Sequence, residues 1–174
     1  MRQGRYQQAA HHHRQALTLF RELGNRAGEA YALTNLGAVD VSRGRYQQAA
    51  SHHQEALTLF RELGDRAGEA EALNGLGDAL LASGQPEDAR AQHAIALGLA
   101  SQIGDKFERA RAHNGLAHTF HATGDPGQAR HHWQQALTVY TELGAPEVDD
   151  VRARLTAAQG AEPREPHPPA GRSG

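Results

Sequence analysis

Histidine is the residue type in this sequence that could most readily carry chemistry, because the chain has 12 histidines and no cysteine. Imidazole binds metal ions and exchanges protons near neutral pH. The run His11-His12-His13 does not converge on one ion in a helix, where consecutive side chains point about 100° apart. His118 and His121 can share a helix face, but a zinc site needs three or four protein ligands. No third ligand stands at a matching spacing, so we predict no metal site and no cofactor.

Other chemistry has less support. The sequence contains no G-x-S-x-G elbow, no H-E-x-x-H and no G-x-x-x-x-G-K-[S/T] phosphate loop. A formal net charge of −2 gives no basic surface for nucleic acid. No apolar run approaches the roughly 18 residues of a membrane span, and the N-terminus lacks a signal peptide's apolar core. We therefore expect a cytoplasmic protein that is not an enzyme and contacts neither nucleic acid nor membrane directly.

A 40-residue repeat organises the histidines and the rest of the chain. The segment GRYQQAAHHHRQALTLFRELGNRAGEAYAL, at positions 4–33, returns at positions 44–73 with five differences. Further copies begin near Gly84 and Gly124. One position of the repeat always carries a ring, and its members are His13, His53, His93 and Trp133. We predict that these rings pack between helices instead of binding a ligand.

Each period has the pattern of two helices. Leu73, Leu76, Gly77 and Leu80 recur at the i, i+3, i+4, i+7 spacing of one helix face. The helices are expected at about 4–23, 26–42, 45–63, 66–83, 86–103, 106–123, 126–143 and 147–159. Alanines recur at fixed positions in these helices, where small side chains let helix axes approach closely. The Pro- and Gly-rich segment 160–174 has no periodicity and is predicted to be disordered.

The spacing L-G-x6-G-x4-A-x3-H-x2-A resembles the tetratricopeptide repeat. Leu36-Gly37, Ala49, His53 and Ala56 match it, and the same positions match twice more along the chain. The resemblance implies an all-α, right-handed superhelical solenoid of antiparallel helix pairs, with a half-repeat (4–23), three repeats (26–63, 66–103, 106–143) and a cap helix (147–159) within residues 1–159. The 40-residue period resembles Pins-type adaptors and the C-terminal arrays of bacterial NB-ARC-type regulators.

In that family, the first helices of successive repeats line a concave groove that receives peptides, so the resemblance implies a protein or peptide partner. By position, the implied groove residues are Tyr31, Thr34, Asn35, Glu71, Asn74, Asp78, Arg111, Asn114, His118 and His121. The alternative is that asparagines such as Asn74 are ordinary polar surface residues. Gly75 and Gly115 each lose about 1 kcal/mol of helix propensity, and room for a close-lying partner chain is one of the gains that could offset this loss. The charges in this set are mixed.

The first copy of the repeat is a second helix alone. Its contact face consists of Ala9, His13, Ala16 and Phe20, which would lack their usual partner helix. Unpartnered apolar faces often mark contact sites. Three interpretations stay open: the chain is a truncated reading frame or a sensor or oligomerisation fragment of a larger bacterial regulator, it self-associates through this face, or these small residues tolerate exposure.

Overall fold

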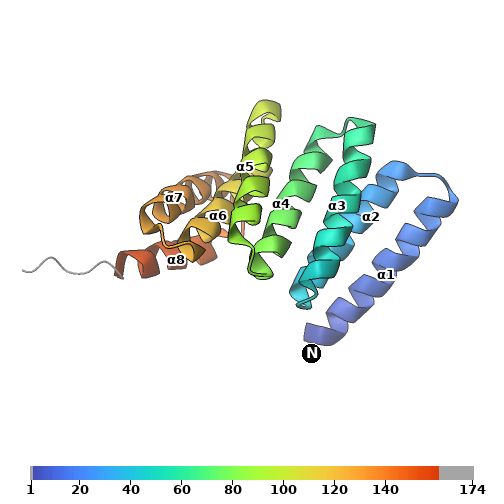
Figure 1. Ribbon diagram of the computed structural model, residues 1–174, viewed down its shortest axis with the longest axis horizontal. Helices are drawn as coiled ribbons and strands as arrows, with labels where there is room; N and C mark the ends of the chain where they lie inside the picture. The colour runs from blue at the N-terminus through green and yellow to red at the C-terminus, as the bar shows by residue number, and fades with distance from the viewer. Residues whose placement is uncertain (1, 161–174) are drawn as a thin grey trace, which may run out of the picture.

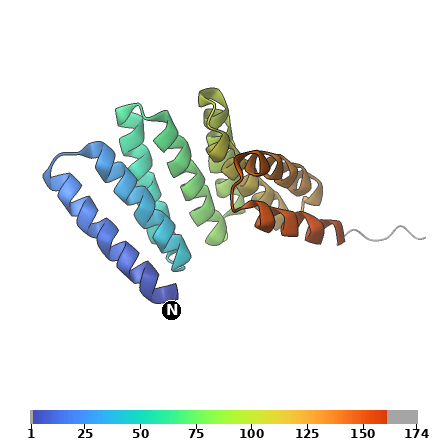
Figure 2. The ribbon, with the colours of Figure 1, turned by 180° about the vertical axis from the view of Figure 1, so that it is seen from behind.

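The chain folds into a row of antiparallel helices that step along one axis. A computed structural model describes residues 2–160, and this part consists of eight helices without a strand. Figures 1 and 2 show the row from its two sides, with α1 at one end and α8 at the other. The helices are α1 (Arg2–Glu22), α2 (Arg26–Ser42), α3 (Tyr46–Leu63), α4 (Arg66–Ala82), α5 (Pro86–Ile103), α6 (Lys106–Ala122), α7 (Pro126–Leu143) and α8 (Val148–Gly160). All eight helices begin and end within two residues of the expected bounds. The predicted all-α solenoid is confirmed. Residues 161–174, which belong to the predicted disordered tail, lie outside the described residues.

Local sequence signals account for the helix ends. The Asp65 carboxylate accepts a hydrogen bond from the Gly68 backbone N–H at 2.9 Å, which caps the start of α4. Asp105 caps α6 in the same way, through the Glu108 backbone N–H at 2.9 Å. Gly64 ends α3 in the left-handed conformation, with φ of 70°, which a side chain would disfavour. These caps make each connection short, so consecutive helices must pack side by side.

Alanine forms the contacts between helices, as the repeat predicted. Each of the following alanines has an exposed fraction of 0%: Ala49, Ala56, Ala89, Ala96, Ala129 and Ala136. Leu33, Leu73 and Phe60 fill the space beside them and are buried as well. Burial is therefore shared between neighbouring repeats, as expected for a solenoid. Besides its sequence neighbours, α4 packs against both α2 and α6, so these three helices line one face, the α2–α4–α6 face.

The ring position of the repeat lies between the helices of this face. His53 of α3 is 2% exposed, and its ring lies between Gly37 of α2 and Gly75 of α4. A Cβ atom at position 37 would lie 2.4 Å from the ring's Nε2, and one at position 75 would lie 2.3 Å from its Cε1. His93 lies in the same way between the next two glycines of the pattern, at positions 77 and 115. The predicted packing of the rings is confirmed for His53, His93 and Trp133, which are all buried, whereas His13 is half-buried.

The structure gives a reason for Gly75 and Gly115 other than room for a partner chain. A Cβ atom at position 115 would lie 2.3 Å from Cε1 of His93. A Cβ atom at position 75 would lie at the same distance from Cε1 of His53. The histidine rings already fill the space over these glycines. Close approach of a ring is therefore what excludes a larger residue at both positions.

The first helix packs on one side only. Ala9, His13, Ala16 and Phe20 are half-buried, whereas their equivalents in α3 are buried. Phe20 still packs over Gly28, because a Cβ atom there would lie 2.5 Å from the Phe20 ring. The face that the repeat pattern assigns to a helix contact is therefore partly accessible at this end.

Exposed ion pairs join different helices, both between and within repeats. Arg21 of α1 contacts Glu55 of α3 at 2.5 Å, and Lys106 of α6 contacts Glu142 of α7 at 3.4 Å. Each pair contributes little stability, because solvent screens the charges.

A carboxylate is buried in α2. Asp40 is 1% exposed, and neither of its oxygens accepts a hydrogen bond. His52 Nδ1 lies 3.2 Å from Asp40 Oδ2. Leucine occupies the equivalent position in the next repeat, as Leu80.

The helices of the described part, 2–160, include none that is long and apolar enough to cross a membrane.

Candidate functional site

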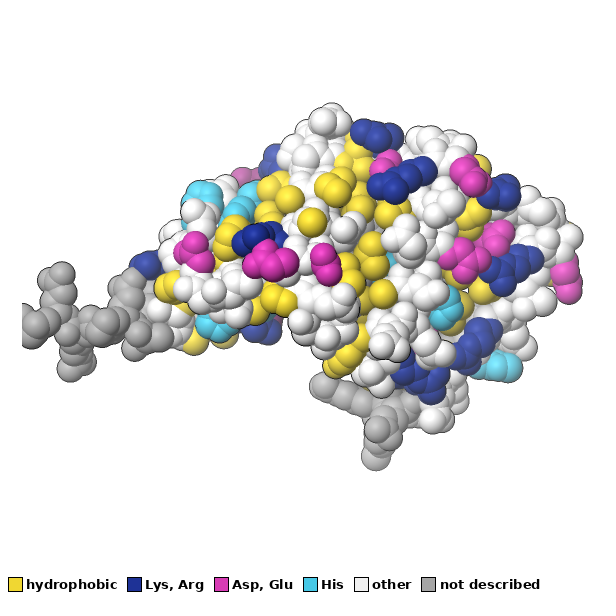
Figure 3. Space-filling view, in the orientation of Figure 1, with side chains coloured by type: hydrophobic (Ala, Val, Ile, Leu, Met, Phe, Trp, Pro, Cys, Tyr) yellow, Lys and Arg dark blue, Asp and Glu magenta, His cyan; other side chains and the backbone are white. Residues whose placement is uncertain are grey.

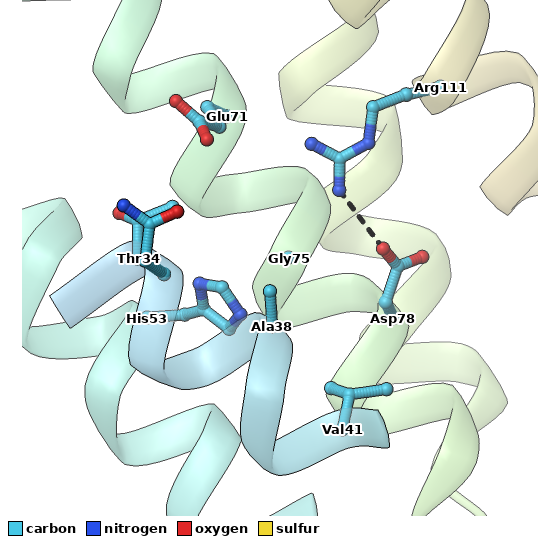
Figure 4. A pocket seen from close by; sticks show the side chains of 9 residues that line it. Thr34, Ala38, Val41, His53, Glu71, Gly75, Asp78 and Arg111 are labelled. Carbon is cyan, nitrogen blue, oxygen red and sulfur yellow. Dashed lines mark hydrogen bonds and ion pairs between the residues drawn. The ribbon is translucent and has the colours of Figure 1, made fainter. Parts of the chain in front are cut away.

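A hollow of about 190 Å³ opens on the α2–α4–α6 face (Figure 4). Nine residues line it: Thr34, Asn35, Ala38 and Val41 of α2, His53 of α3, Glu71, Gly75 and Asp78 of α4, and Arg111 of α6. The helical spacing of three or four residues places the α2 and α4 residues on the same side of their helices. Three successive repeats therefore contribute to this one cavity, which we call the first hollow.

A second hollow of about 370 Å³ adjoins the first. The two share Ala38, Asp78 and Arg111. The second hollow is further lined by Phe107, Asn114, Tyr140 and Glu147. The α2–α4–α6 face therefore carries a depression that extends from α2 to the turn before α8.

Arg111 lies between the two hollows and is committed to two carboxylates. Its guanidinium contacts Asp78 Oδ2 at 3.1 Å, the dashed line in Figure 4. It also donates to both oxygens of Glu108, each at 3.2 Å. Burial opposes its charge, but Asp78 and Glu108 outweigh this effect and raise its pKa. Arg111 is thus neutralised within the protein.

Glu71 is a carboxylate of the first hollow without a cation of its own. It is half-buried, and it makes no hydrogen bond or ion pair within the described residues. Burial raises its pKa, the Glu108 carboxylate raises it further, and Arg111 partly opposes both effects. Glu71 therefore faces the hollow as a carboxylate without a direct hydrogen-bond or ion-pair partner.

His53 closes one wall of the first hollow with an imidazole that has no hydrogen-bonding partner. Neither Nδ1 nor Nε2 has one in the structure. Burial lowers the pKa of His53 to about 4; Asp78 opposes this shift and Arg111 adds to it. The ring is therefore neutral at pH 7, with one nitrogen that can accept a hydrogen bond and one that can donate.

Asn74 is not a groove residue, and this part of the sequence-based site is wrong. Its exposed fraction is 0%. Its amide nitrogen donates to the Glu108 backbone carbonyl at 3.0 Å and to the Glu108 carboxylate at 2.9 Å. Its Oδ1 lies 3.1 Å from Nδ1 of His93. The amide joins α4, α5 and α6 and is not free for a peptide.

Other residues predicted for the groove differ in how exposed they are and in whether their polar groups are already hydrogen-bonded. Tyr31 is 42% exposed, but its hydroxyl donates to Asp65 Oδ2 at 2.9 Å. Burial, followed by this bond, raises the Tyr31 pKa to about 12. Thr34 is buried, and its hydroxyl donates to the Ala30 carbonyl at 3.0 Å. Asn114 lines the second hollow, and its Oδ1 is buried without a partner.

His118 and His121 are brought together by an aromatic ring. Both pack against Trp133, with ring centroids 5.5 and 5.6 Å from its own. Burial, with a contribution from Arg154, lowers the pKa of His118 to about 4. Within residues 2–160, no three side chains of the metal-binding types gather as ligands.

Sequence reasoning placed most of the first hollow but missed part of it. Glu71, Asp78 and Arg111 were expected on this face, and the structure brings them to one cavity. His53 was assigned to packing, although one side of its ring also lines the cavity. The repeat gave no signal for this second role, because every copy has a ring at that position.

The opposite face has no region of one charge. Figure 3 shows acidic and basic side chains beside each other, with a band of hydrophobic side chains over the middle of this view. This mixed surface contrasts with the first hollow, where carboxylates predominate.

Comparisons with known proteins agree with this architecture. A family model described as tetratricopeptide repeat matches residues 1–62, 30–102 and 68–142. Among curated proteins, no match is found.

Three solved structures show the same fold. BtubC (BKLC) from P. vanneervenii is 18% identical, with a TM-score of 0.75 over 90% of this chain and 66% of that chain. A Rap protein complexed with competence and sporulation factor is 16% identical, with a TM-score of 0.81 over 90% of this chain and 44% of that chain. The TPR domain of Arabidopsis FLU is 21% identical, with a TM-score of 0.56 over 76% of this chain and 98% of that chain. The chain thus spans about two thirds of BtubC and under half of the Rap protein.

Proposed function

We propose that this chain is a protein-interaction module that binds an extended segment of a partner polypeptide. The chain belongs to the tetratricopeptide repeat family. One of its structural neighbours, the Rap protein, was solved in complex with competence and sporulation factor. The bound segment would lie along the α2–α4–α6 face, across both hollows.

The observation that carries this proposal is the joined pair of hollows with unsatisfied polar groups. Asn35 is exposed at the first hollow, and Asn114 Oδ1 is without a partner at the second. Amide groups can both donate to and accept from a peptide backbone, which suits an extended segment. A cavity lined by four helices also removes more of a ligand from water than a flat surface does.

A bulky side chain at a residue that lines both hollows tests the proposal. Ala38 is exposed on α2 and lines both hollows, so Ala38→Trp should block them. Ala27→Trp is the matched control, because Ala27 is also exposed on α2 but lines neither. Peptides selected by phage display against the wild-type chain should lose at least tenfold in affinity with Ala38→Trp, measured by fluorescence anisotropy. Equal binding by wild type and Ala38→Trp would place the interaction elsewhere.

A second candidate is the sensor or oligomerisation part of a larger bacterial regulator, of the kind that carries NB-ARC-type domains. If the chain instead acts as a scaffold, Pins-type adaptors are the proteins that its repeat resembles. The half-buried face of α1 favours a role in assembly, through self-association. Sedimentation velocity of the wild-type chain at several concentrations tests it. A monomer at all concentrations would remove self-association and leave the peptide-binding role.

A further inference from the structure

The first hollow has unequal charge on its walls. Glu71 and Asp78 face it with carboxylates, and Arg111 brings the single cation among its lining residues. Arg111 is also held by Glu108, a further carboxylate at 3.2 Å. Asp65 and Asp105 act in the same direction, since both raise the pKa of Glu71. The field in the cavity is therefore negative, and a low-dielectric wall strengthens it.

Two side chains of the cavity have unused hydrogen-bonding capacity. The Glu71 carboxylate has no partner within the described residues, although it is half-buried. The His53 ring, 2% exposed, leaves both nitrogens without a partner while it lines the cavity. The His53 nitrogens are buried polar atoms without a partner, which are rare in native proteins. Figure 4 shows both side chains at the cavity, from different helices.

The other wall of the first hollow is apolar. Ala38 and Val41 of α2 provide it, on the side away from Glu71 (Figure 4). A ligand that fits therefore combines an apolar stem with a head that is positively charged and rich in N–H donors. Arginine and lysine side chains have this composition, and arginine can also donate to two acceptors at once.

We propose that the first hollow receives a cationic side chain, arginine or lysine, of the partner polypeptide, with Glu71 as its counter-charge and the His53 ring in the wall beside it. This inference rests on the proposed peptide-binding function. The ligand stem contacts Ala38 and Val41. An acidic side chain is disfavoured, because the cavity's one cation is already paired with two carboxylates.

Oriented peptide pools test this specificity. Four pools of nonapeptides have degenerate flanks and a fixed central arginine, lysine, leucine or glutamate, and each is titrated against the wild-type chain. The arginine and lysine pools should bind at least tenfold more tightly than the leucine pool, and the glutamate pool should bind most weakly. With Glu71→Gln, this preference should fall to less than threefold.

A matched variant separates the local effect from overall charge. Glu87→Gln changes the net charge by the same amount at an exposed position of α5 and should keep the tenfold preference. Circular dichroism checks that both variants fold. A single arginine peptide from the best pool should also shift the ¹⁵N resonances of the His53 ring.

Each outcome bears on one part of the reasoning. Equal binding of all pools, still blocked by Ala38→Trp, overturns the cationic specificity and leaves the peptide-binding function standing. An undiminished basic preference in Glu71→Gln overturns the role of Glu71, and unmoved His53 resonances overturn that of the ring. Absence of binding by every pool and by display-selected peptides overturns the proposed function itself.

Discussion

Replacing Gly75 with alanine tests whether the His53 ring is held tightly between two helices. The new Cβ atom would lie 2.3 Å from Cε1 of the ring. The ring has no room to retreat, since position 37 on its other side is already so close that a Cβ atom there would lie 2.4 Å from Nε2. The strain must therefore be relieved by moving α2 and α4 apart.

Two effects of opposite sign set the size of the change. Alanine is favoured over glycine inside a helix by about 1 kcal/mol. Adding a methyl group to a closely packed site destabilises by about 1–3 kcal/mol. The net free energy of unfolding of Gly75→Ala should therefore fall by between zero and about 2 kcal/mol.

Gly98→Ala provides the control. Gly98 lies inside α5, and a Cβ atom there would have no neighbour within 4 Å. This variant should gain about 1 kcal/mol, so the two alanine variants should differ by about 1–3 kcal/mol. Urea unfolding followed by circular dichroism measures both. In a His53→Ala background, Gly75→Ala should no longer destabilise, because the ring is gone. If Gly75→Ala stabilised the wild-type chain as much as Gly98→Ala does, the account of the ring would be refuted.

Further predictions concern buried polar groups. Asp40→Leu, which introduces the residue of the equivalent position Leu80, should raise the melting temperature, because it removes a buried carboxylate that accepts no hydrogen bond and whose ion-pair contacts are with His52 at 3.2 Å and Arg45 at 3.9 Å; a lower melting temperature would contradict this. Asn74→Ala should lower the free energy of unfolding by about 1–3 kcal/mol, through loss of its bonds to α5 and α6. Asn114→Ala, whose Oδ1 has no partner, should change it by less than about 0.5 kcal/mol, and equal losses in urea unfolding would refute the distinction. Glu71→Gln should stabilise the chain at pH 7, since the raised pKa of Glu71 means that its ionisation opposes folding. This advantage should shrink as the pH falls through the folded-state pKa and vanish below the ordinary glutamate value of about 4.3; thermal melts that show a constant difference from pH 3 to 7 would exclude it.

Helix positions could be predicted from the sequence because their determinants are local. Asp105 and Gly64 act within one turn of the chain, and the 40-residue period repeats these signals in register. The ring position was also predictable, since four copies show His53 and its equivalents at the same place. In a solenoid, contacts recur with the period, so a position's role in one repeat indicates its role in the next.

The site was less predictable where its chemistry depends on a neighbouring repeat. Asn74 has the register of a groove residue, but the Glu108 carbonyl of α6 turns its amide into the interior. The cost of glycine at Gly75 is visible in the sequence, whereas the atom that requires it comes from α3. The isolation of Glu71 likewise depends on Arg111 being engaged by other carboxylates. These are relations between side chains of different repeats, which periodicity alone does not contain.

The ring between α2 and α4 also acts as a spacer that sets the pitch of the superhelix. Its thickness fixes how far apart successive first helices lie, so one residue per repeat controls the local curvature. His53 and His93 each lie between two glycines, whereas the last repeat carries Trp133 at the ring position and Ala117 at the position of the first glycine. Exchanging histidine for a larger or smaller ring at position 53 would then adjust the width of the first hollow without touching a residue of α2 or α4. The array's shape can thus be tuned one repeat at a time.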